Sequence, residues 1–280
     1  HESGTIWNQK SSKWLVPRFI AWKANIVLSN SYATKIMLVK KISIPEKKIR
    51  VLYNGINTLK EYDHSCHHKK NNLKFRIGFI GRLDSPKGVH VLIDAMHYLK
   101  NKNFELVIAG NGILESLLRE RASALNNVSF IGRVKNPYLF MSKIDLLVVP
   151  SIREPLGNVC LEAGLCRVPV LAANVDGLPE IIENKISGEL IDATEEISIN
   201  TVQGAISLPE FVVNPVKGNL SAPKQINPSI LAKRILKLSS QDDKLKYYSN
   251  ELNKKVKNKF SIDRYRRELH KMYREIDIKG

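Results

Sequence analysis

Two glutamates, Glu154 and Glu162, are separated by seven residues in a stretch that follows an apolar run at 146–149. Glu154 falls in the loop after that run, and Glu162 falls one turn into a helix that we expect to begin near Asn158. A carboxylate accepts two hydroxyl donors well, which is what a sugar or a ribose offers. Gly157 lets the backbone approach a ligand closely, and the free N–H groups of the helix that follows favour an anion. Each glutamate alone would be an ordinary surface acid, but the combination predicts a site for a phosphate flanked by polyol groups.

Two cations could form the other half of such a site. Arg82 and Lys87 follow a predicted strand at 75–80, within the short turns GRL and KG. A guanidinium binds a diphosphate as a planar fork, and an ammonium binds it as a point charge. The alternative, two surface cations near a turn, loses weight beside the two glutamates. The chemistry that these four side chains favour is therefore recognition of a diphosphate joined to hydroxyl-bearing groups.

The elements that must position these residues alternate between short apolar runs and apolar residues at helical spacing. A strand, a loop, a helix and another strand in succession form a parallel-sheet crossover, and ligands bind beyond the carboxyl ends of such strands. An Asn-Gly pair at 54–55 predicts a tight turn. We expect strands at 26–28, 75–80, 146–149 and 168–172, and three further strands that start at 49, 104 and 128. We expect helices at 114–124, 229–238, 242–257 and 260–276. Another helix should end near 41, and two more should start at 88 and 158.

The stretch Glu154-PLGNVCL-Glu162 resembles the glutamate-x7-glutamate signature of retaining glycosyltransferases of family 4, which have the GT-B fold. The motifs Ala163-Gly164, Pro169-Val170 and DGLPE at 176–180 follow in the family's order. The resemblance runs from residue 25 to the C-terminus. It implies an α/β fold with a Rossmann-like, parallel-sheet, nucleotide-sugar-binding domain at 74–259. It further implies the remnant of a second Rossmann-like, acceptor-side domain at 1–57, a linker at 58–73, and a C-terminal helix at 260–280 that crosses back to the first domain.

The resemblance also implies a function, the transfer of a sugar from a nucleoside diphosphate sugar with retention of configuration. Arg82 and Lys87 would neutralise the departing diphosphate, Glu154 would hold hydroxyls of the transferred sugar, and Glu162 would hold the ribose. His1 would line the active site. No cofactor or metal is implied, and the donor would be a UDP-, GDP- or ADP-sugar. The catalytic set is then Glu154, Arg82, Lys87 and His1, and the donor-binding set is Gly81, Val134, Leu156, Gly157, Asn158 and Glu162.

The resemblance implies a first domain without its front part, which leaves other functions open. Family members usually have well over a hundred residues before the part matched here, so a donor-binding fragment or pseudoenzyme is one alternative. A basic nucleic-acid-binding protein is another, because the net charge is +17 and the isoelectric point is about 9.7. The chain shows no RNA-binding strand, zinc finger or helix-turn-helix pattern, so we expect no nucleic acid and favour an anionic membrane surface as partner.

The first 24 residues carry Trp7, Trp14 and Trp22 among lysines and arginines, so they could lie in a lipid interface or pack on the domain. We expect Pro17 to interrupt a helix there. No apolar run approaches the roughly 20 residues that span a bilayer. We expect a cytoplasmic protein, or one peripheral on the cytoplasmic face of the inner membrane. The Lys-, Ile- and Asn-rich composition suggests a bacterial gene. The family resemblance implies a glycan or glycolipid acceptor of the lipopolysaccharide or capsule type.

Three remaining segments carry weaker signals. Cys66, Cys160 and Cys166 are expected to be free thiols in a reducing cytoplasm. Residues 58–73 contain His64, Cys66, His67 and His68, whose spacing suits a variable linker better than a tetrahedral zinc site. Residues 192–227 form an insertion that we expect to be an irregular surface loop with one short strand at 211–213.

Overall fold

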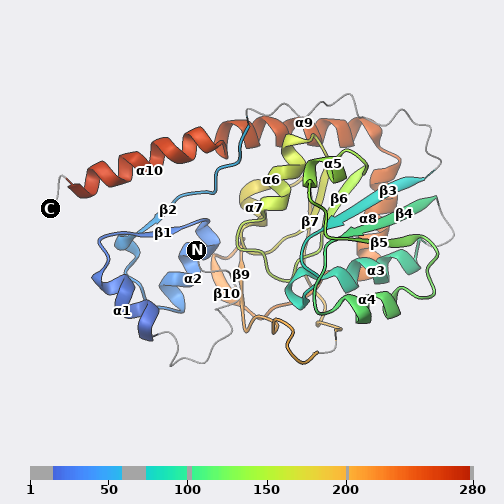
Figure 1. Ribbon diagram of the computed structural model, residues 1–280, viewed down its shortest axis with the longest axis horizontal. Coiled ribbons are helices and arrows are strands. Elements are labelled where there is room, and N and C mark those ends of the chain that lie inside the picture. Colours follow the sequence, from blue (N-terminus) through green and yellow to red (C-terminus); the bar gives the residue numbers. More distant parts are fainter. Residues whose placement is uncertain (1–14, 59–73, 100–102, 200–201, 278–280) are drawn as a thin grey trace.

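A sheet of six parallel strands organises the larger part of the molecule (Figure 1). The computed structural model describes residues 15–58, 74–99, 103–199 and 202–277. The strands lie in the order β5-β4-β3-β6-β7-β8. Successive strands therefore run outward from β3 on one side and from β6 on the other, and the topology reverses between these two strands. The bounds are β3 Phe75–Ile80, β4 Phe104–Ala109, β5 Val128–Gly132, β6 Leu146–Val149, β7 Val170–Ala173 and β8 Glu189–Ile191.

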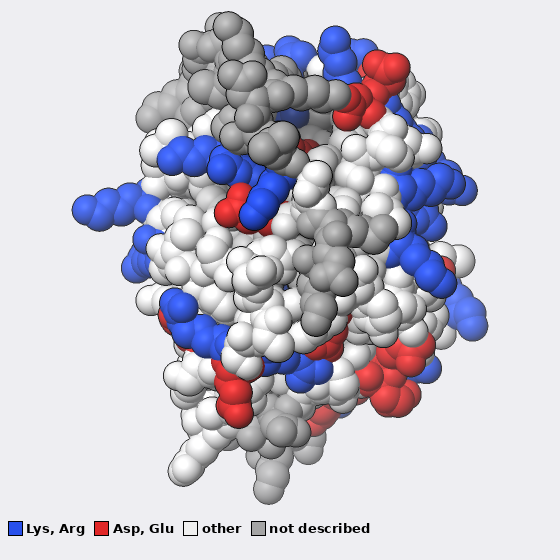
Figure 2. All heavy atoms as spheres, turned by 90° about the vertical axis from the view of Figure 1, so that its right-hand side faces the viewer, with Lys and Arg blue, Asp and Glu red and all other residues white. Residues whose placement is uncertain are grey.

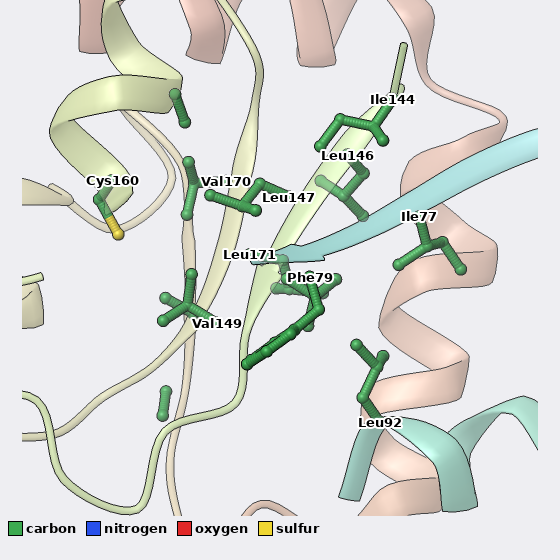
Figure 3. Close-up of a cluster of buried hydrophobic side chains, with 14 of the residues drawn as sticks. Ile77, Phe79, Leu92, Ile144, Leu146, Leu147, Val149, Cys160, Val170 and Leu171 are labelled. Atoms are coloured by element: carbon green, nitrogen blue, oxygen red, sulfur yellow. The ribbon is translucent and has the colours of Figure 1, made fainter. Parts of the chain in front are cut away.

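Helices cover both faces of this sheet, which is why its central strands are continuous apolar runs. One group packs together on one face, α3 (Val89–His97), α4 (Glu115–Arg121) and α8 (Pro228–Ser239). A second group covers the other face, α5 (Pro137–Met141), α6 (Asn158–Leu165) and α9 (Asp242–Lys259), with the short α7 (Leu178–Ile181) beside them. Every residue of β6 and β7 is buried. Figure 3 shows this core, in which side chains of β3, β6 and β7 meet Leu92 of α3 and Cys160 of α6.

The N-terminal elements form a smaller body beside the carboxyl ends of the strands (Figure 1). They are α1 (Leu15–Lys23), β1 (Val27–Ser29), α2 (Tyr32–Lys40), the 3-10 turn η3 (Glu46–Lys48) and β2 (Ile49–Val51), and β1 pairs with β2 in parallel. Ser31 caps α2 by accepting a hydrogen bond from the Thr34 N–H at 3.0 Å. The prediction that Pro17 interrupts a helix is wrong, because Pro17 lies within α1 as described and the helix continues past it to Lys23.

The insertion at 192–227 is not an irregular surface loop throughout. It contains an antiparallel hairpin, β9 (Val212–Asn214) and β10 (Asn219–Ser221), so the predicted short strand is confirmed within one residue. This hairpin packs on α2. Phe211 and Val213 are buried in the same apolar cluster as residues of the N-terminal body, namely Ala21, Ala33, Met37, Ile42, Ile44 and Ile49. The expectation of a loop failed because these packing partners lie far away in the sequence.

The last helix, α10 (Ile262–Asp277), runs back beside the N-terminal elements (Figure 1). It begins against the segment that follows β2, since Ile56 and the Phe260–Ile262 segment exchange hydrogen bonds of 2.8 and 2.9 Å. The tight turn predicted at Asn54-Gly55 is wrong, since the chain passes through without a turn. Glycine is needed at position 55 because the backbone there packs closely against α10, and a Cβ would lie 2.7 Å from Cβ of Tyr265.

The loops after β3 and β6 are joined where the topology reverses. The Pro86 carbonyl accepts the N–H groups of Ile152 and Arg153 at 2.9 and 3.2 Å. Gly88 has φ +66°, and a Cβ on it would lie 2.0 Å from the Pro150 carbonyl oxygen. A side chain at this position would therefore both strain the backbone and push the two loops apart.

We predict that Gly88→Ala destabilises the chain more than Gly132→Ala does. Gly132 has a similar φ of +70°, but a Cβ added there would meet nothing within 4 Å. The Gly132→Ala substitution should therefore lower the free energy of unfolding only by the cost of a left-handed backbone for alanine, about 1–2 kcal/mol. Gly88→Ala adds the collision with Pro150. Denaturant midpoints of the two variants measure the difference, and equal losses would show that the loops do not need this contact.

Candidate functional site

A cavity of about 890 Å³ lies at the carboxyl ends of β3 and β6, between the sheet and the N-terminal elements. Its volume is within the usual range for small-molecule sites, and its position is the topological switch point of the sheet. Most of the residues predicted for the site line it, namely Gly81, Arg82, Lys87, Glu154, Leu156, Gly157, Asn158 and Glu162. The structure therefore brings together side chains from the loops after two non-consecutive strands.

Lys87 and Glu154 face each other across these loops. Their side chains form an ion pair, Nζ to Oε2, of 2.6 Å, and they are 25% and 10% exposed. Ser151 Oγ donates to the same Oε2 at 3.3 Å. The other oxygen, Oε1, accepts no hydrogen bond from the part of the chain that is described, and Lys87 has two further N–H donors. Both groups can thus keep their ion pair and still bind a ligand.

Arg82 lies at the mouth of the cavity. Its side chain is 58% exposed, and its Nε is 3.7 Å from Oδ2 of Asp84, too far for a hydrogen bond. The turn that carries it is fixed by the Gly81 N–H, which donates to the Ala109 carbonyl at 3.0 Å. The guanidinium therefore projects from a rigid turn with donors to spare for an anion.

The N-terminus of α6 supplies backbone donors to the same cavity. Gly157 precedes the helix with φ +101°, and no side chain caps the first turn. A Cβ at Gly157 would lie 2.7 Å from Leu178 and 3.5 Å from Cγ of Glu154, so only glycine fits here. The Asn158 Oδ1 accepts a hydrogen bond of 2.8 Å from Nδ2 of Asn54. A helix start of this kind favours an anion.

Glu162 lies on α6 one turn beyond Asn158 and lines the same cavity as Glu154. Its carboxylate makes no hydrogen bond or ion pair with any other described residue, and burial raises its pKa above the ordinary value. A half-buried carboxylate with unused acceptors suits hydroxyl donors. The two acids thus face one cavity, as the sequence predicted.

Two of the predicted site residues are not placed in the cavity. Val134 follows β5 and packs half-buried against the core, outside the cavity lining. His1 lies outside the described residues, as do Cys66 and the histidines of 59–73.

Sequence reasoning missed the contribution of the N-terminal body to the cavity. Ser29, Asn30, Thr34 and Asn54 line it, with Tyr265 of α10. Polar residues directly after a strand, as at Ser29 and Asn30, were the available signal. Arg153, also in the lining, is only 5% exposed, and burial lowers its pKa to about 10.

Among the residues that the structure describes, the remaining chemistry-bearing side chains do not form a second site. Cys160 and Cys166 are free thiols, as predicted, but burial raises the pKa of Cys166 to about 12 and that of Cys160 further, so neither is a nucleophile at neutral pH. Among the described residues no group of three or more His, Cys, Asp or Glu side chains could hold a metal ion. In the same part of the chain no helix has the length and apolarity to cross a membrane.

A doubly wound parallel sheet with cations, acids and a helix start at its switch point is an α/β arrangement of the GT-B type, as expected. Residues 63–203 match the family model described as glycosyl transferases group 1, which is half of the chain. The chain belongs to this family.

Individual relatives agree with this assignment. The chain is 32% identical over 210 residues to the uncharacterized glycosyltransferase MJ1607 of Methanocaldococcus jannaschii, covering 68% of this chain and 54% of that protein. It is 26% identical over 275 residues to the capsular polysaccharide biosynthesis glycosyltransferase CapM of Staphylococcus aureus, covering 93% and 64%. It is 31% identical over 181 residues to a Campylobacter jejuni N-acetylgalactosaminyltransferase named for a diphospho-undecaprenol acceptor, covering 63% and 49%. The chain thus spans about half to two thirds of the length of these relatives.

A solved structure shares the fold. The crystal structure of Anabaena Alr3699/HepE in complex with UDP-glucose superimposes with a TM-score of 0.72 at 20% identity, covering 95% of this chain and 68% of that one.

We predict that Glu162→Gln raises the melting temperature at pH 7. Because the folded pKa lies above the unfolded value of about 4.3, the ionised carboxylate lowers the free energy of unfolding at neutral pH. The gain should shrink as the pH falls through the window between the two pKa values. Glu115→Gln, at a half-buried acid of α4 paired with Arg119, is the control. If Glu162→Gln were no more stable than wild type at pH 7, burial in the site would not destabilise the ionised Glu162 carboxylate.

Proposed function

We propose that this chain binds a nucleoside diphosphate sugar in the switch-point cavity and transfers the sugar with retention of configuration. The observation that carries the proposal is the convergence of Arg82, Lys87, Glu154 and Glu162 on one cavity beside the start of α6. The retaining outcome has its support in the resemblance of the two glutamates to the family signature.

The geometry suggests a role for each group. Arg82, Lys87 and the N–H groups at the start of α6 would neutralise the charge that grows on the departing diphosphate, which is where an enzyme gains most from fixed donors. Oε1 of Glu154 would accept a hydroxyl of the transferred sugar, and Glu162 would accept the ribose hydroxyls. These cations would take the place of a metal. The family resemblance, rather than the geometry, adds His1 and the backbone at Val134 to the proposed set, as groups near the sugar and the base.

The relatives suggest the classes of donor and acceptor. HepE was crystallised with UDP-glucose, and the Campylobacter relative is named for a glycan carried on diphospho-undecaprenol. A UDP-sugar, or its GDP or ADP counterpart, is therefore the proposed donor. A glycan or glycolipid of the capsule or O-antigen type is the proposed acceptor.

A second candidate, a donor-binding chain without activity, follows from the length of the relatives. This chain spans only 54% and 64% of two of them. Release of labelled sugar from the nucleotide sugar, by transfer or hydrolysis, favours the enzyme. Binding without release favours the second candidate.

Nucleic-acid binding has less support, because on the face in Figure 2 the basic side chains form separate groups rather than one stripe. Salt-dependent retention on RNA or DNA would revive that candidate.

We predict that Arg82→Ala, Lys87→Ala and Glu162→Ala each weaken binding of the tightest of UDP-glucose, GDP-mannose and ADP-glucose by roughly tenfold or more, because each removes a charge-assisted contact. Isothermal calorimetry measures the affinity. Lys237→Ala, at an exposed lysine of α8, is the matched control and should bind as wild type does. A variant that keeps wild-type affinity removes its residue from the proposed site.

We further propose that α1 associates with an anionic membrane. Five of its apolar side chains are 60–66% exposed, namely Leu15, Val16, Phe19, Ile20 and Trp22. Arg18 and Lys23 lie on the same helix, and the chain carries a net charge of +17. An exposed apolar row with basic neighbours suits the headgroup region of anionic lipid, where a lipid-linked acceptor would also lie.

We expect the double substitution Phe19→Ser and Trp22→Ser to lower binding to vesicles of phosphatidylglycerol and phosphatidylethanolamine by roughly tenfold, since both remove apolar area from the lipid interface. Vesicle co-sedimentation measures the loss. Tyr98→Ser, at an aromatic residue that is 61% exposed beside the sheet, is the control. Unchanged binding of the double variant would refute the role of α1.

A further inference from the structure

A buried carboxylate, Asp176, joins the Glu154 loop to the hairpin β9–β10. Asp176 is 3% exposed. Its Oδ2 accepts the Glu154 N–H at 2.9 Å, and its Oδ1 accepts the Val213 N–H at 2.7 Å. The Asp176 N–H in turn donates to the Val213 carbonyl at 3.1 Å. One side chain thus holds two backbone segments that are 59 residues apart in the sequence.

The backbone at Asp176 indicates that this carboxylate is required where it lies. Its φ is +45°, in the left-handed region that favours glycine and costs other residues about 1–2 kcal/mol. The next residue, Gly177, donates its N–H to the Glu154 carbonyl at 3.1 Å. Residues 176–177 therefore hold both backbone polar groups of Glu154. The strain is offset by hydrogen bonds that end on a residue of the proposed site.

The far side of this connection is anchored in the N-terminal body. Val213 is 1% exposed and belongs to the same buried cluster as Ala33 and Met37 of α2. The hairpin cannot move without opening this cluster. The position of the Glu154 backbone is therefore tied, through Asp176, to the core of another part of the molecule.

Glu154 depends on such support, because it lies in a loop outside any helix or strand. Its Oε2 is occupied by Lys87 and Ser151, and only Oε1 is left for a ligand. A shift of the Glu154 backbone would turn this oxygen away from the cavity, whereas Arg82 and Lys87 follow another strand, β3.

We propose that Asp176 is a positioning residue which, with hairpin β9–β10, holds Glu154 ready for the transferred sugar. The insertion thereby affects the affinity for the sugar part of the donor but not the affinity for the nucleoside diphosphate part. This inference rests on the proposed function for the sugar contact, but the support of the loop can be measured without any ligand.

The first measurement is amide hydrogen exchange at Glu154 in the unliganded chain. In wild type the Glu154 amide should be protected to the level of the neighbouring strand β6. Asp176→Asn keeps the size of the side chain but turns an amide toward one of the two N–H donors, and Asp176→Gly relieves the φ strain but leaves both donors unpaired. Each should speed exchange at Glu154 and Val213 at least tenfold while leaving β3 and β4 unchanged. Glu210→Gln, at an exposed acid in the same insertion, is the control.

The second measurement compares the affinity of UDP with that of UDP-glucose, and GDP with GDP-mannose. The Asp176 variants should lose roughly tenfold in affinity for the nucleotide sugar, about one hydrogen bond to a charged group, while the nucleoside diphosphate binds within about twofold of wild type. Equal loss for both ligands would reduce Asp176 to a structural residue and overturn the inference.

The two measurements separate the possible failures. An unprotected Glu154 amide in wild type would overturn the inference even where the variants fail to fold. Wild type that binds the nucleotide sugar no tighter than the diphosphate would refute the proposed sugar contact of Glu154, whatever the exchange rates show.

Discussion

The contact between Lys87 and Glu154 is the interaction on which the site depends. The two residues follow different strands, β3 and β6, and they meet at 2.6 Å only because the strand order reverses between those strands. A partly exposed ion pair contributes little to the stability of a fold. The fold instead determines the position of the pair. The buried strands, and the hydrogen bonds from the Ile152 and Arg153 N–H groups to the Pro86 carbonyl, fix both loops. A cation and an acid held at one point, each with bonding capacity left, form a site suited to a ligand that carries both a diphosphate and hydroxyls.

Much of this fold could be predicted from the sequence. The strand at 146–149 matched because a strand buried on both faces is a continuous apolar run bounded by turn residues. The strand at 75–80 matched because Arg76 is its only charged residue and Gly81 follows its end. The site residues near α6 and after β3 could be found because their chemistry is local in the sequence. Two of the failures share a cause, which is packing between distant segments. Gly55 packs against α10, about 200 residues later in the sequence, and the hairpin β9–β10 packs against α2, about 170 residues earlier. Neither contact is visible in a local sequence pattern.

The N-terminal body is more than a neighbour of the sheet domain, because carboxylates of the DGLPE segment reach into it. Glu180 accepts the N–H groups of Tyr32 and Ala33 at 2.8 and 2.9 Å, where a negative charge favours the start of α2. It also accepts the Tyr53 hydroxyl at 2.8 Å. Burial, together with this carboxylate, raises the pKa of Tyr53, which therefore remains a donor. With Asp176 holding the hairpin, one short segment fixes the wall of the cavity to both bodies.

The most direct measurement is a crystal structure of the chain grown with UDP-glucose, GDP-mannose or ADP-glucose. The diphosphate should lie between Arg82, Lys87 and the start of α6, with ribose hydroxyls on Glu162 and sugar hydroxyls on Glu154. A cavity that stays empty at saturating ligand, or a ligand bound at another surface, would contradict the assignment of this cavity as the donor site.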